Sequence, residues 1–308
     1  MAETLEDLRD QVESTRDLSS ITRAMKALAA VRIRQSREAV DSLRTYGDTV
    51  TAGFRILLLR EPRYLEGGEV EEEKGGAGFP EAGPPLTVAL GSDLGMVGRF
   101  NRKVAELVEE SLGEEERRGE PPLLLTVGER VAGALEGKGF EVEARFPMPD
   151  TVEGMSGAVQ DLLVTLEELR RKRHPSRILL FHNAYRSGAE YEPVSLQLLP
   201  LDRGWLEGLA QGPWPTGVLP GFLASPERLF LRLLREHLFL SLFRAMAESH
   251  ASENASRLAS MEAAQKRIDE RLEDLKGRLN QQRKQQMTEE LLDIMAGAAA
   301  LEEEEEEP

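Results

Sequence analysis

The chain has 308 residues, enough for one large or two modest domains with a buried core. Its formal net charge of −16 at pH 7 disfavours a role in coating nucleic acid, because a phosphate backbone would repel the molecule. It contains no cysteine, which excludes disulfides, thiolate nucleophiles and zinc–thiolate sites. Charged residues make up 31 % of the sequence and aromatic residues only 5 %, a composition typical of long solvated helices.

Residues 1–60 form one predicted helix. Apolar residues recur every three or four positions from Glu3 to about Leu59, which is the period of an amphipathic helix. At 1.5 Å per residue such a helix would reach roughly 80 Å, too long for a small globular domain to wrap. We therefore expect it to pair with another helix.

Residues 61–85 follow with the composition of a linker. Glycine, proline and glutamate replace the apolar period here, so we expect a flexible connection.

Residues 86–205 alternate between strand-like and helix-like segments. Strands are expected at 86–90, 123–127, 140–146, 177–181 and 194–199. Helices are expected at 102–116, 129–137 and 155–174. This alternation predicts a small Rossmann-like α/β domain with a parallel or mostly parallel sheet, followed by a connecting loop at 206–224.

Residues 225–301 form the second predicted long helix. It starts with Ser225 as N-cap and Pro226 at the first helical position, and it carries a near-heptad apolar seam. Two long helices at opposite ends of a chain favour an antiparallel coiled coil, the shaft. Residues 302–308 form an acidic tail that we expect to be disordered by self-repulsion.

The glycine-rich stretch GSDLGMVGRFN at 91–101 lies between a predicted strand and a predicted helix, where phosphate is often bound. It lacks the lysine and hydroxyl of a phosphate loop, and its glycine spacing is wrong for a dinucleotide fingerprint. A tight turn whose glycines allow positive φ and close packing is the favoured interpretation. We expect no nucleotide to bind here.

Other catalytic and metal-binding patterns are also missing. The four histidines never occur at i, i+4 spacing, so no metal site is predicted. No nucleophile elbow of the G-x-S-x-G type occurs. The sequence therefore predicts a non-catalytic protein without cofactors.

One run of the first helix has an unusual charge. Between Asp17 and Glu38 it carries no acid but five cations: Arg23, Lys26, Arg32, Arg34 and Arg37. A solvated face would mix both signs, so this basic collar predicts an acidic partner surface.

Four motifs resemble the gamma subunit of F-type ATP synthase. ITRAMKALAA at 21–30 resembles that family's ITKAMxMVAA, and SDLGMVGRFN at 92–101 resembles its SDRGLCGGFN. Two further motifs lie in the second long helix. The first comprises Ser252, Glu253, Arg257, Met261 and Ala264; the second comprises Asn280, Arg283, Thr288, Glu290, Ile294 and residues 297–301.

The resemblance implies a function for the whole chain. In this family the paired terminal helices are a rotor shaft inside a ring of alpha and beta subunits. The α/β domain is the foot, against the epsilon subunit and the membrane c-ring. It implies a peripheral position at the cytoplasmic face of a bacterial plasma membrane, with coupling of ion flow to ATP synthesis or hydrolysis. A non-rotary coiled-coil adaptor with a degenerate α/β domain is the alternative.

The resemblance also implies which residues bind partners. The expected set is Arg23, Met25, Lys26, Arg32, Arg34, Arg257, Arg283, Lys284, Thr288 and Glu290. In the family the collar and Arg257 meet an acidic loop of beta, and Arg283 belongs to a catch near the tip of the shaft. Lys284 replaces the family's glutamine, which adds a second cation next to Arg283.

Overall fold

The computed structural model of the chain describes residues 4–65, 83–116, 121–211, 214 and 216–305. The predicted linker at 61–85 therefore falls mostly outside the described residues, although Pro62–Leu65 form a short 3₁₀ helix, η1. The chain divides into two compact units. One comprises residues 1–28 with 259–308, and the other comprises residues 29–258.

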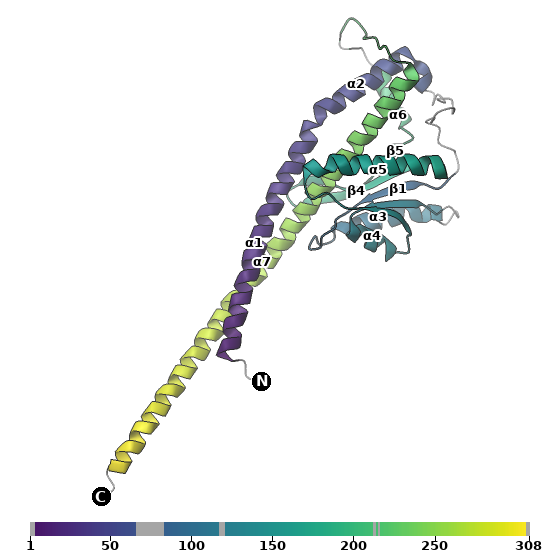
Figure 1. Cartoon of the computed structure of the whole chain (residues 1–308). Coiled ribbons are helices and arrows are strands. Elements are labelled where there is room, and N and C mark those ends of the chain that lie inside the picture. The colour runs from purple at the N-terminus through teal and green to yellow at the C-terminus, as the bar shows by residue number, and fades with distance from the viewer. Residues whose placement is uncertain (1–3, 66–82, 117–120, 212–213, 215, 306–308) are drawn as a thin grey trace. The chain divides into compact units, whose positions relative to one another are not determined.

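Three helices make up the terminal segments of the chain, as Figure 1 shows: α1 (Leu5–Ser42), α2 (Arg44–Arg60) and α7 (Pro226–Glu305). The predicted long N-terminal and C-terminal helices are confirmed. The N-terminal one is interrupted at Leu43, where a single unbroken helix was expected. Ser42 Oγ donates to the carbonyl of Ala39 at 2.8 Å and competes for the acceptor that Leu43 N reaches at only 3.3 Å. Such back-bonding by serine bends helices.

The C-terminal helix begins as predicted and ends later. Ser225 caps it through a bond from Arg228 N to Ser225 Oγ (3.4 Å), and Pro226 occupies the first position. The helix continues through Glu305 rather than ending at Leu301, so the expectation of disorder is wrong for residues 302–305. Glutamate is a good helix former, and adding residues to an existing helix needs no new nucleus.

In the first unit, α1 and α7 pair as antiparallel helices. Leu8 and Val12 pack with Leu275 and Leu279 in a buried apolar cluster. Further along α1, Gln265 Nε2 donates to Ser19 Oγ at 2.8 Å. Residue numbers thus fall along α7 as they rise along α1, which confirms the antiparallel coiled coil.

In the second unit the sheet has five strands: β1 (Leu86–Leu90), β2 (Leu123–Val127), β3 (Val142–Phe146), β4 (Ile178–Ser187) and β5 (Glu190–Leu199). Their order is β3-β2-β1-β4-β5. All neighbours are parallel except β4 and β5, which form an antiparallel hairpin. The predicted mostly parallel α/β domain is confirmed.

Four further helices belong to this unit: α3 (Phe100–Glu116), α4 (Glu129–Glu136), α5 (Val152–Arg173) and α6 (Arg203–Ala210). Helix α6 crosses the expected boundary at residue 205. Asp202 accepts from Trp205 N at 2.6 Å, and this N-cap starts a helix inside the segment that was expected to be a loop.

The two faces of the sheet bury different helices. Leu86, Val88 and Leu90 of β1 point into a core shared with α2, α5 and α7. Ala89, on the opposite face of the same strand, packs with α3 and α4. Figure 1 shows α5 on one side of the sheet and α3 and α4 on the other. The α2 and α7 helices are therefore part of the same core as the sheet.

Phe54 lies at the centre of that core and is fully buried. Its ring makes edge contacts with Trp205 (5.6 Å between centroids), Phe230 (6.1 Å) and His237 (6.0 Å). One side chain of α2 thus joins α6 to the start of α7. Burial lowers the pKa of His237, so this imidazole is neutral at pH 7.

We predict that Phe54→Ala lowers the free energy of unfolding by about 3–5 kcal/mol, because it leaves a cavity among these rings. Urea denaturation followed by circular dichroism measures the loss. Leu223→Ala, at a side chain that is 109 % exposed, is the matched control and should change stability by less than about 0.5 kcal/mol. Equal effects of the two substitutions would contradict the placement of Phe54 in the core.

Candidate functional site: the joint between the α/β domain and α7

The loop at 91–101 is held by its own polar side chains. Both carboxylate oxygens of Asp93 accept backbone N–H bonds, from Glu129 (2.9 Å) and from Met148 (2.8 Å). Asn101 closes the loop through Ser92: its Oδ1 accepts from Ser92 N, and its Nδ2 donates to Ser92 Oγ, both at 2.9 Å. These polar groups are therefore engaged in building the turn.

Glycines at this loop allow backbone segments to approach closely. A Cβ on Gly91 would collide with Val131 and with the amide of Asn101. Gly128 has φ +108°, and a Cβ there would lie 2.8 Å from Ser92 N. The geometry thus assigns Gly91 and Gly128 to packing of the strand ends against each other.

The same loop is hydrogen-bonded to α7. Ser256 Oγ donates to the carbonyl of Val97 at 2.6 Å. Ser252 Oγ lies 3.0 Å from the carbonyl of Asn183 and 2.8 Å from the carbonyl of Glu248 on its own helix, so it shares its one proton between these two acceptors. Asn183, at the end of the buried part of β4, donates in turn to the carbonyl of Phe100 at 3.0 Å. We call Ser252, Ser256 and their two carbonyl acceptors the joint.

Small side chains let α7 come this close. Ala251 and Ala255 alternate with the two serines, and all four residues are buried. Because the serines are one helical turn apart, both hydroxyls face the α/β domain. Buried hydroxyls bonded to buried carbonyls fix one register of the helix against the domain, since any slip would leave polar groups without partners.

A buried polar network on α7 lies beside the joint. His250 Nδ1 and Ser36 Oγ of α1 are 2.8 Å apart, and Asn254 Nδ2 lies 3.3 Å from His250 Nε2. Arg257 Nη1 donates to Asn254 Oδ1 (3.3 Å), which turns the amide nitrogen of Asn254 toward the imidazole. Ser36 Oγ and Asn254 Nδ2 thus lie at the two ring nitrogens of His250.

The electrostatics agree with a neutral His250. Burial, together with the nearby cations Arg32 and Arg257, lowers its pKa from 6.5 to about 4, while Asp150 opposes the shift. Arg32 is itself 3.8 Å from Asp150. The network therefore holds no charge on the imidazole at neutral pH.

Arg257 and Glu253 form a buried ion pair within α7. Their charged atoms are 2.6 Å apart, and the two residues are 4 % and 6 % exposed. Burial raises the pKa of Glu253, and Arg257 opposes that shift. In this chain Arg257 thus holds Glu253 and Asn254 rather than presenting its guanidinium at the surface.

The other sequence-predicted partner residues lie in several environments. In the first unit Arg23, Arg283, Lys284, Thr288 and Glu290 are exposed, and Met25 and Lys26 are half-buried. Lys26 lies 3.9 Å from Glu262. In the second unit Arg34 is exposed and pairs with Glu38 at 2.7 Å, whereas Arg32 is half-buried.

The basic collar therefore divides by exposure. Arg23 and Arg34 are available to a partner, and Arg37 is also exposed, with its guanidinium 5.8 Å from the ring centre of Tyr185. Arg32 and Arg257 are instead engaged within the chain.

Sequence reasoning missed the residues of the joint. The sequence points to Ser252 only through the family motif, and it gives no reason to single out His250 or Ser256. The available signal was the small-residue run Ala251, Ser252, Ala255 and Ser256 within a helix rich in long side chains. Its acceptors, Val97 and Asn183, contribute backbone carbonyls and so leave no signal in the sequence.

Among the described residues, no cluster of three His, Asp or Glu side chains could hold a metal ion. None of the described helices is long and apolar enough to span a bilayer. The described residues thus comprise two long helical segments, one of which is hydrogen-bonded to an α/β domain.

Comparisons with known proteins give the class. A family model described as ATP synthase matches residues 4–301. The chain therefore belongs to the ATP synthase gamma-chain family. The ATP synthase gamma chain of Anaeromyxobacter sp. (strain K) is 28 % identical over 97 % of this chain and 99 % of that protein. The gamma chain of Chelativorans sp. (strain BNC1) is 24 % identical over the same shares.

Solved structures show the same fold. The rotor of the Euglena gracilis mitochondrial ATP synthase matches with a TM-score of 0.58 at 18 % identity, over 92 % of this chain and 98 % of that chain. A chain of the OSCP/F1/c-ring structure of the same enzyme matches with a TM-score of 0.61 at 15 % identity, over 99 % and 96 %.

We predict that His250 makes the chain less stable in acid. Its pKa is about 4 when folded and 6.5 when free, so the unfolded chain takes up a proton that the folded chain refuses. The contribution is complete above pH 6.5 and is lost as the pH falls toward 4, with a loss of at most about 3 kcal/mol.

Thermal melts between pH 7 and pH 4 measure this effect. His250→Asn should flatten the slope of stability against pH in that window. His174→Asn, at an exposed left-handed position that asparagine tolerates, should keep the wild-type slope. A wild-type slope in the His250 variant would show that the imidazole is not held neutral.

Proposed function

We propose that this chain is the gamma chain, the central rotor shaft, of an F-type ATP synthase. The antiparallel helix pair is the shaft, and the α/β domain bonded to α7 is the foot. Its partners are the alpha and beta subunits around the shaft, with the epsilon subunit and the membrane c-ring at the foot. The observation that carries the proposal is the hydrogen-bonded joint, because a rotor needs a fixed register between foot and shaft.

The joint explains how torque can pass from the foot into α7. Directional bonds at Ser252 and Ser256 resist sliding and twisting of the helix in a way that apolar contacts alone do not. The network of Ser36, His250 and Asn254 adds α1 to the same connection. A turning foot would therefore carry both helices with it.

The shaft itself acts by biasing the states of its partners. An asymmetric rotor makes different contacts with each surrounding subunit, and only such differential contacts can shift a subunit between conformations. The chain is then a non-catalytic subunit that needs no cofactor and binds no nucleotide. We place it at the cytoplasmic face of a bacterial plasma membrane, as a peripheral part of the membrane-associated complex.

The exposed members of the sequence-predicted set are the proposed contact residues of each unit. In the first unit these are Arg23, Arg283, Lys284, Thr288 and Glu290, with the half-buried Met25 and Lys26. In the second unit they are Arg34 and the half-buried Arg32. We assign Arg257 an indirect part, since its buried pair with Glu253 supports the network beside the joint. The comparisons give no support to the adaptor alternative.

Affinity purification of the tagged chain from its native membranes tests the assignment directly. Alpha, beta and epsilon subunits should co-purify with it in detergent, and mass spectrometry identifies them. Recovery of the chain without any ATP synthase subunit would favour the coiled-coil adaptor.

We predict that Ser252→Ala together with Ser256→Ala weakens the joint by about 2 kcal/mol, at about 1 kcal/mol for each lost hydrogen bond. In membrane vesicles the number of ions pumped per ATP should fall while ATP hydrolysis continues. Ser260→Ala, at a half-buried position about one turn further along α7 and outside the joint, is the matched control and should pump normally. Normal pumping by the double variant would argue against torque passing through the joint.

We predict that Arg283→Gln together with Lys284→Gln slows ATP hydrolysis by the assembled complex roughly two- to fivefold, because exposed charges contribute modestly to a contact. The melting temperature of the chain should not change, since both side chains are exposed. Lys276→Gln, an exposed cation of α7 outside the family motif, is the control. If the double variant and Lys276→Gln hydrolyse ATP at the same rate, Arg283 and Lys284 do not form the proposed contact.

A further inference from the structure

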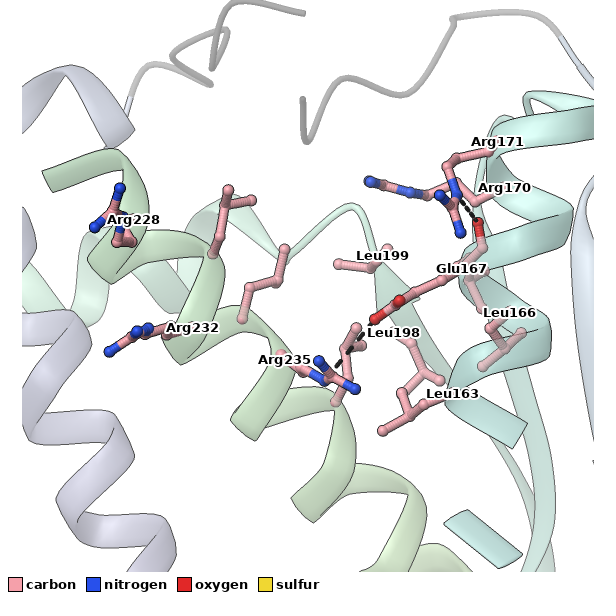
Figure 2. A pocket seen from close by; sticks show the side chains of 14 residues that line it. Leu163, Leu166, Glu167, Arg170, Arg171, Leu198, Leu199, Arg228, Arg232 and Arg235 are labelled. Carbon is pink, nitrogen blue, oxygen red and sulfur yellow. Dashed lines mark hydrogen bonds and ion pairs between the residues drawn. The ribbon is translucent and has the colours of Figure 1, made fainter. Parts of the chain in front are cut away.

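A cavity of about 410 Å³ opens beside the sheet in the second unit, between α5, the end of β5 and the first turns of α7 (Figure 2). Its floor is entirely aliphatic and comprises Leu163, Leu166, Ile178, Leu198, Leu199, Leu231, Leu234 and Leu238. The volume falls in the range of about 300–1,000 Å³ that is usual for small-molecule sites. Neither the fold nor the proposed rotary function uses this cavity.

The rim of the cavity is strongly basic. Five arginines line it: Arg170 and Arg171 from α5, and Arg228, Arg232 and Arg235 from α7. Glu167 is the one acidic residue of the lining, so the described rim carries five positive charges and one negative charge. On a protein whose net charge is −16, such a rim attracts anions locally.

Three of the arginines and Glu167 are arranged around the mouth. Figure 2 shows Arg235 from α7 facing Glu167 of α5, with Arg170 and Arg171 beside it, while Arg228 and Arg232 turn away from α5. Arg235 and Glu167 are 3.9 Å apart and both are exposed, so this pair is weak. Burial lowers the pKa of Arg170, against the pull of Glu167. An added anion at the mouth would stabilise these guanidinium groups.

We propose that the cavity binds a free fatty acid, with its acyl chain on the leucine floor and its carboxylate among Arg170, Arg171 and Arg235. Guanidinium groups match a carboxylate with two parallel N–H bonds. The aliphatic floor matches a hydrocarbon chain, which needs no hydrogen-bond partner.

The lining favours a fatty acid over other anions. A peptide would bring backbone N–H groups, and the only side-chain acceptor of the lining is the Glu167 carboxylate, so those donors would be left unpaired. A cavity of this size suits one acyl chain rather than the two of a phospholipid. A small anion such as phosphate would leave the leucine floor empty.

Calorimetric titration of the full-length chain with laurate, below its micelle concentration, tests the proposal. We expect saturable binding of one laurate per chain. Lauryl alcohol and acetate should each bind at least about tenfold more weakly. The alcohol lacks the carboxylate that binds the arginines, and acetate lacks the acyl chain that packs on the aliphatic floor.

Three variants locate the site. Arg171→Gln with Arg235→Gln should weaken laurate binding about tenfold at low salt, and Leu231→Trp should abolish it by filling the floor. Glu167→Gln removes the competing carboxylate and should tighten binding several-fold, a gain that misfolding cannot produce. Arg102→Gln, an exposed arginine of α3 outside the cavity, is the matched control and should bind as wild type.

Several outcomes would overturn the proposal. Absence of saturable laurate binding, or equal affinity in all variants, would remove the cavity as the site. Equal binding of lauryl alcohol would show an apolar site without anion recognition. A peptide of residues 66–82 that displaces laurate and binds more tightly than laurate would assign the cavity to an acidic segment instead. Binding only to phosphatidylglycerol vesicles, sensitive to the same variants, would assign it to a lipid surface.

Discussion

The hydrogen bonds from Ser252 to the carbonyl of Asn183 and from Ser256 to the carbonyl of Val97 are the constraint on which the second unit depends. They require small residues on that face of α7, glycines where the strand ends meet, and a loop whose shape Asp93 fixes. Buried hydroxyl–carbonyl bonds specify position more than they add stability, because each contributes only about 1 kcal/mol but costs more when broken inside the protein. A shaft that must stay in register with its domain needs this kind of contact.

Polar side chains around the joint bind other groups of the same chain. His250 is neutral between Ser36 and Asn254, and Glu253 is paired with Arg257. A buried pair of this kind adds little net stability, but removing one partner leaves an uncompensated charge. The motif residue Arg257 therefore has a structural reason to be an arginine in this chain, since it neutralises the buried Glu253.

The chain has two basic regions, the collar on α1 and the arginines around the cavity between α5 and α7. Within the basic collar Arg23 and Arg34 are exposed, while Arg32 lies 3.8 Å from Asp150. The second basic region, at the cavity between α5 and α7, was not visible in the sequence because its arginines come from two segments about sixty residues apart. Only packing of α5 beside α7 gathers them around one aliphatic floor.

The sequence by itself determined the two long helices, the order of strands and helices, and the family, because apolar period and contiguous motifs are local properties. Tertiary structure decided the strand limits, hydrogen-bond partners and buried charges that depend on residues distant in the chain. Strand β5 begins at Glu190 rather than at Val194 because its polar first half is ordered by pairing with β4. Asp93 fixes the loop because it accepts a hydrogen bond from the backbone N–H of Met148, which is distant in the sequence. Arg257 is buried because α7 packs against the α/β domain at this position. Period sets which face of a helix is apolar, but only the fold sets which polar groups lose contact with water and must find partners.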